Sequence, residues 1–128
     1  MREEVKWWLS LALKNLERAD RALRAHDYAE AIFWCHQAVE FALKACIINR
    51  GKLPEKTHNL VKLWRQAEMG IQVELHMLSE LTPYYSISRY PDIYQGVPEI
   101  REETVRRFYQ FTLRLVKRVE KKLHEEGA

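Results

Sequence analysis

The sequence predicts an all-α protein, an up-and-down bundle of four to five helices, and three observations support this. Apolar residues recur every three or four positions over long segments, which is the pattern of amphipathic helices. Only four Gly and four Pro interrupt the 128 residues. A composition of 47% apolar and 30% charged residues is typical of a folded globular protein. We therefore expect residues 1–128 to form a single domain.

The first helix should run from Glu3 to His26. One apolar stripe supports it, formed by Val5, Leu9, Ala12, Leu16, Ala19 and Leu23. Trp7 and Leu11 fall off this stripe, so we expect the start of this helix to touch a second surface.

The second helix should span Tyr28–Asn49, with Asp27 as its N-cap and Gly51 as a stop signal after its end. Thr57 or Asn59 is placed to cap a third helix.

Gly70 should interrupt the third helix, and a short fourth helix should end near Pro83. The Tyr-rich stretch from Pro83 to Pro98 has no clean period and is expected to be an ordered loop. A last helix should run from Glu99 to Glu125.

The second helix has unusual surroundings for its polar stripe. A helical wheel places its small residues on one inner face, and it places Gln37, Glu40 and Lys44 nearly opposite. Five large apolar residues border that stripe: Phe33, Trp34, Phe41, Ile47 and Ile48. If exposed, they would form a contiguous apolar patch, so we expect a second buried contact on the outer face.

Two explanations for this contact remain open. A twofold homodimer with those five residues in its interface is the first, because twofold dimers are the commonest oligomers. In the second, the first and last helices wrap far enough to cover the same residues within one bundle.

The polar residues also have two interpretations. Glu40 and Lys44 stand at the i,i+4 spacing of a solvated ion pair. At a dimer interface, Gln37, Glu40 and Lys44 would instead fix the register or line a cleft. His58, which starts the third helix, is expected to be a capping or packing residue rather than a general base.

The Tyr-rich loop offers the best candidate for a ligand contact. Its Tyr85, Arg89 and Tyr90 combine stacking faces with a phosphate-binding cation, which suits nucleotides or single-stranded RNA. Alternatively, the rings plug the open end of the bundle, and Asp92 simply pairs with Arg89.

Other classes of function have little support in the sequence. Five scattered His without a Cys-x-x-Cys motif predict no metal site, and no cofactor motif is present. Cys35 and Cys46 are eleven residues apart on one predicted helix, about 16 Å, so they should be reduced core thiols of a cytoplasmic protein. No apolar run approaches the length of a membrane span, and a net charge of +3 gives no DNA-binding signal.

Several stretches resemble the HEPN family of small helical proteins, often encoded beside a minimal nucleotidyltransferase. They are "DYAEAIFWCHQAVEFALKA" (Asp27–Ala45), Gly51, Pro54, "THNL" (Thr57–Leu60) and "RYPD" (Arg89–Asp92). The resemblance implies a helical bundle that is usually dimeric, with a cleft between protomers. It also implies a nucleotide or RNA ligand, or partnership with the nucleotidyltransferase in a toxin–antitoxin pair.

Many relatives cut RNA with an Arg followed four to six residues later by His, and this motif is missing near Arg89. Two formal matches occur, Arg21 with His26 and Arg118 with His124, whereas chance alone gives about 1.4. The main expectation is therefore a dimeric binding module. The alternatives are a metal-independent ribonuclease using Arg89 with His58 or Tyr90, and a purely structural interaction subunit.

Overall fold

The structure, a computed structural model, describes residues 1–90 and 99–127. Within these ranges every regular element is a helix, which confirms the predicted all-α class. The helices are α1 (Glu3–Arg24), α2 (Tyr28–Asn49), α3 (Leu60–Ala67), α4 (Leu75–Leu81), α5 (Tyr84–Ile87) and α6 (Glu102–Gly127). The single turn of α5 lies where the sequence predicted a loop, so that prediction is wrong for these four residues.

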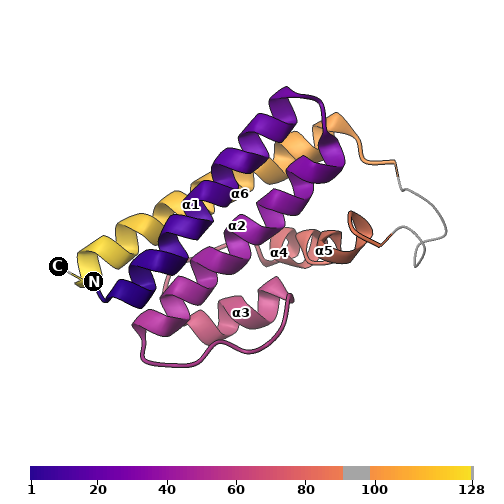
Figure 1. Cartoon of the computed structure of the whole chain (residues 1–128). Helices are drawn as coiled ribbons and strands as arrows, with labels where there is room; N and C mark the ends of the chain where they lie inside the picture. Colours follow the sequence, from indigo (N-terminus) through magenta and orange to yellow (C-terminus); the bar gives the residue numbers. More distant parts are fainter. Residues whose placement is uncertain (91–98, 128) are drawn as a thin grey trace.

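The long helices α1, α2 and α6 lie side by side, and the short helices α3, α4 and α5 flank them (Figure 1). α1 and α2 form an antiparallel hairpin, and the two chain ends meet at one end of the bundle. There the Met1 amino group donates to the carbonyl oxygen of Gly127 at 3.0 Å. α2 packs against α1, α6, α3 and α5, which makes it the central helix of the fold.

The predicted helix boundaries at both ends of α2 are confirmed. The Asp27 carboxylate accepts from the backbone N–H of Glu30 at 3.4 Å, as an N-cap should. Gly51 has a φ of +76°, a conformation that costs glycine little and other residues more. Asn59 caps α3 by accepting from the N–H groups of Val61 and Lys62.

The inner face of α2 is buried as predicted. Its small residues are all in the core: Ala31, Cys35, Ala38, Val39, Ala42 and Cys46. Both cysteines are free thiols, and burial raises the pKa of each to about 12. They are therefore protonated and inert at neutral pH.

The outer face of α2 corrects part of the predicted interface. Phe33 and Ile47 are already buried within the single chain. The prediction that a second contact on the outer face buries them is therefore wrong for these two residues. Trp34, Phe41 and Ile48 are only half-buried. The Phe33 ring is covered in part by the Tyr85 ring, 5.8 Å away between centroids, and by the Arg89 guanidinium, 3.6 Å from its centroid.

By length and composition, α2 is apolar enough to cross a membrane, which corrects the expectation that no run approaches such a span. However, 72% of its most apolar window is buried inside the bundle. That burial is typical of the core helix of a globular fold.

Candidate functional site

A buried carboxylate stands at the centre of the candidate site. Glu40 projects from α2 and is only 1% exposed, yet it is paired on both oxygens. Lys44 Nζ lies 2.9 Å from Oε2, and His58 Nδ1 lies 2.8 Å from Oε1. An isolated buried carboxylate would be strongly unfavourable, so these two donors are required by the fold. The predicted solvated Glu40–Lys44 pair is therefore wrong about its solvation, because the segment before α3 covers Glu40.

His58 is held between this carboxylate and an aromatic ring. Its imidazole stacks on Tyr85 with centroids 3.6 Å apart and planes 16° apart. Because Nδ1 faces Glu40, the other ring nitrogen, Nε2, is the one left for an external partner. The expectation for His58 is a capping or packing residue: Asn59 rather than His58 caps α3, whereas the stacking on Tyr85 makes His58 a packing residue whose side chain is 47% exposed.

A second histidine, His36, supports this arrangement from beneath. It is fully buried on α2, and its Nε2 donates to the backbone carbonyl of His58 at 2.9 Å. Its Nδ1 lies 3.0 Å from the side-chain oxygen of Gln37, and in a neutral ring Nδ1 accepts from the Gln37 amide nitrogen once that amide is flipped. Burial lowers the pKa of His36 against the opposing effect of Glu40, which favours a neutral ring that anchors the His58 backbone.

Arg89 lies on the next part of the same face. Its guanidinium stacks on Phe33, 3.6 Å from the ring centroid, and makes two contacts with Glu30 at 2.9 and 3.4 Å. Arg89 is therefore fixed and neutralised by its own chain. The partner that the sequence suggested for it, Asp92, lies outside the described residues.

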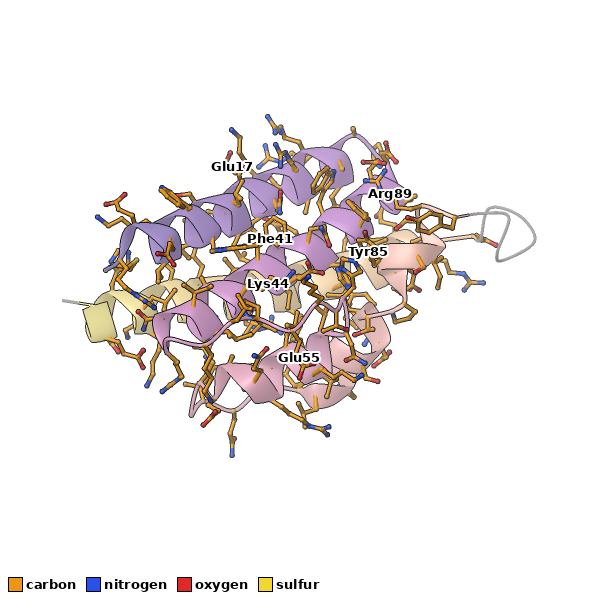
Figure 2. All side chains as sticks on the ribbon, turned by 60° about the horizontal axis from the view of Figure 1, so that its bottom comes forward. Glu17, Phe41, Lys44, Glu55, Tyr85 and Arg89 are labelled. Atoms are coloured by element: carbon orange, nitrogen blue, oxygen red, sulfur yellow. The ribbon has the colours of Figure 1, made fainter. Side chains whose placement is uncertain are left out.

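The structure brings together most of the predicted ligand-binding residues. Figure 2 shows Lys44, Tyr85 and Arg89 along one face of α2, with Phe41 beside Lys44 on the side toward α1. Gln37, Glu40 and His58 belong to the same face through the contacts above. Tyr90 is 45% exposed at the end of the described segment, apart from this network.

Sequence reasoning did not identify three parts of this site: His36, Glu30, and Phe33 as the ring on which Arg89 stacks. The spacing of Glu30 to Trp34 was a usable signal, since the indole Nε1 donates to the Glu30 carboxylate at 3.2 Å across one helical turn. Nothing local connects His36 with the backbone of His58. Among the described residues, no group of three His, Cys, Asp or Glu side chains is arranged to hold a metal ion.

The depressed pKa of His36 predicts a pH-dependent stability. Because the folded-state pKa is lower than the unfolded one, the unfolded chain takes up the proton first as pH falls. We expect the free energy of unfolding to decrease from pH 7 to pH 5, and the decrease to be smaller in His36→Gln. Urea titrations followed by circular dichroism at each pH measure this.

His76→Gln, which removes an exposed imidazole on α4, is the matched control and should keep the wild-type slope. A His36→Gln slope as steep as that of the wild type would contradict the assignment.

Comparison with known proteins agrees with this architecture. The family model for the HEPN domain matches residues 5–122. The crystal structure of TT1696 from Thermus thermophilus is similar, with 27% identity, a TM-score of 0.81, and coverage of 95% of this chain and 100% of that chain. ST0689, an archaeal HEPN homologue, is 25% identical with a TM-score of 0.74 over 96% of this chain and 99% of that one. A search of curated proteins finds no match. Since the family model spans most of the sequence, the chain belongs to the HEPN domain family.

Proposed function

We propose that this HEPN protein is a homodimeric binding module for a nucleotide or single-stranded RNA. It would partner a minimal nucleotidyltransferase in a toxin–antitoxin-type system of the cytosol. The observation that carries the ligand proposal is the Glu40 carboxylate, whose two oxygens hold Lys44, 15% exposed, and His58, 47% exposed.

The cluster supports phosphate binding through its charge and donors. Lys44 and His58 are two basic residues that share the single carboxylate of Glu40. The ammonium has three donors, and its contact with Glu40 leaves others available. A phosphate placed against Lys44 and the Nε2 of His58 would receive charge-assisted hydrogen bonds.

The neighbouring ring supports recognition of a base. The Tyr85 ring already stacks on an imidazole, and aromatic rings stack on bases with little dependence on sequence. In this proposal Arg89 is not the main phosphate contact, because its guanidinium is already paired with Glu30. Its role is to support the neighbouring aromatic rings by stacking on Phe33.

We expect Lys44→Gln and His58→Gln each to weaken binding of a short single-stranded RNA at least about tenfold, the value of one charge-assisted hydrogen bond. Glutamine keeps an amide donor for Glu40 while it removes the basic group. Fluorescence anisotropy of a labelled oligoribonucleotide, with ATP as a competitor, measures the affinity.

Lys62→Gln removes an exposed lysine from α3 and is the control for net charge. Equal binding by all three variants would remove Lys44 and His58 from the site. Arg89→Ala is predicted to have a smaller effect than either.

The homodimer is supported by apolar residues that the single chain leaves uncovered. Trp7 and Leu11, one turn apart on α1, are 62% and 42% exposed. Beside them, Trp8 makes an edge-to-face contact with Phe41 at 5.2 Å, which continues the apolar surface onto α2. We define the interface patch as Trp7, Leu11, Phe41 and Ile48.

Leu11→Glu should convert the dimer to a monomer, because it places a charge in an apolar interface. Multi-angle light scattering over a concentration series tests this. Leu75→Glu, at a leucine on α4 that is 44% exposed, is the matched control and should remain dimeric.

A wild-type chain that is monomeric at all concentrations would contradict the homodimer. If that monomer formed a complex with a co-expressed minimal nucleotidyltransferase, the interaction subunit would be the better description.

One observation favours a second function, metal-independent RNA cleavage. A carboxylate on His58 Nδ1 orients Nε2 for removing a proton from a ribose 2′-hydroxyl. The 2′-oxygen would then attack phosphorus and the bond from phosphorus to the 5′-oxygen would break. The 5′-oxygen would take a proton from water and His58 would return the proton it removed to the solvent, which leaves a 2′,3′-cyclic phosphate and a 5′-hydroxyl.

This second function predicts that end-labelled RNA is cut in the presence of EDTA and that His58→Ala abolishes the cleavage. Arg89→Ala reports whether the stacked guanidinium contributes. RNA that stays intact with the pure wild-type dimer would retire the idea.

A further inference from the structure

Arg18 on α1 is a further cation close to the proposed site. Arg18 stacks its guanidinium on Trp34, 4.9 Å from the ring centroid, and donates from Nη1 to the Asn15 side-chain oxygen at 2.7 Å. Asn15 is only 1% exposed, so the contact fixes the long Arg18 side chain at a buried anchor.

Among the described residues, no acidic side chain neutralises the charge of Arg18. Within residues 1–90 and 99–127, no carboxylate lies within 4.0 Å of its guanidinium nitrogens. Arg89 differs, because both of its terminal nitrogens contact Glu30. The guanidinium has five donors and Asn15 takes one, so Arg18 keeps donors for an anion.

The network around Trp34 brings the two arginines to one ring. Glu30 accepts from the indole Nε1 and also binds Arg89, whose guanidinium carbon is 5.9 Å from the Trp34 ring centroid. Two guanidinium groups therefore lie within 5.9 Å of the centroid of one indole, and the Glu30 carboxylate beside it binds Arg89 and not Arg18. The excess positive charge is held in place before any ligand arrives.

The Trp34 ring is connected to the His58 cluster by a continuous series of aromatic rings. The ring centroids of Trp34 and Phe33 are 5.1 Å apart, and those of Phe33 and Tyr85 are 5.8 Å apart. Tyr85 then stacks on His58. Cations thus stand at both ends of a series of packed rings, of which Phe33 is buried under Arg89 and the outer members Trp34 and Tyr85 are partly exposed. Aromatic rings spaced between cations favour a single strand over one nucleotide.

We propose that Arg18, positioned by Asn15 and Trp34, binds a second phosphate of the strand whose first phosphate lies at Lys44 and His58. This inference rests on the proposed nucleotide-binding function. It assigns Trp34 to the ligand site and leaves the interface to the patch defined above. The ligand class is a single-stranded oligonucleotide of at least two nucleotides.

The test compares ligands of different length in Arg18→Gln. Glutamine retains a donor for Asn15 but loses the charge, so the fold should be preserved. We expect an unchanged affinity for AMP and a loss of about tenfold or more for a single-stranded tetranucleotide. The slope of log affinity against log salt should fall by about 0.7, the value for one phosphate contact on a single strand.

Arg21→Gln, an exposed arginine on the same helix, is the matched control and should bind like the wild type. Circular dichroism and light scattering are recorded for each variant. Equal loss for AMP and the tetranucleotide, no loss for either, or a dimer that dissociates in Arg18→Gln would each overturn the role of Arg18.

Failure of this inference is distinguishable from failure of the proposed function. If Arg18→Gln binds the tetranucleotide like the wild type while Lys44→Gln and His58→Gln do not, only the second phosphate contact is wrong. If the wild type binds neither ligand, both proposals are wrong.

Discussion

A carboxylate enclosed in an apolar helical bundle has to be paired, and this requirement organises the middle of the molecule. Glu40 is 1% exposed and meets a lysine one turn away on α2 and a histidine eighteen residues later. Removing either basic partner would leave part of a buried charge uncompensated, which is costly in proteins. The position of the segment before α3 is therefore tied to α2 by electrostatics as well as by packing.

His36 extends that constraint to the backbone. Its ring holds the carbonyl group of His58 while Glu40 holds the imidazole, so both halves of His58 are fixed. Tyr85 then covers the imidazole from α5. A residue whose side chain is 47% exposed is in this way held by three contacts, as expected of a recognition group on a rigid scaffold.

The two arginines near this face of α2 differ in whether their charge is neutralised. Arg89 is neutralised by Glu30 and stacked on Phe33, so it acts as part of the scaffold. Arg18 is anchored by a neutral amide and stacked on Trp34, so its charge is available. The sequence drew attention to Arg89 because it lies in a Tyr-rich stretch. The contacts instead favour Lys44, His58 and Arg18 as groups that meet an anion.

The sequence by itself determined the helices other than the single turn of α5, because the signals for them are local. The apolar periods, the Asp27 and Asn59 caps and the positive φ of Gly51 depend on neighbours within one or two turns. Only the tertiary structure decided which residues on the outer face of α2 are buried. A helical wheel places Glu40 opposite the core, but it cannot show that residues from the α2–α3 connection return over that side. Burial of Glu40, His36 and Phe33, and the meeting of Arg18 with Trp34, depend on contacts between segments far apart in the chain. Helical periodicity carries no information about such contacts.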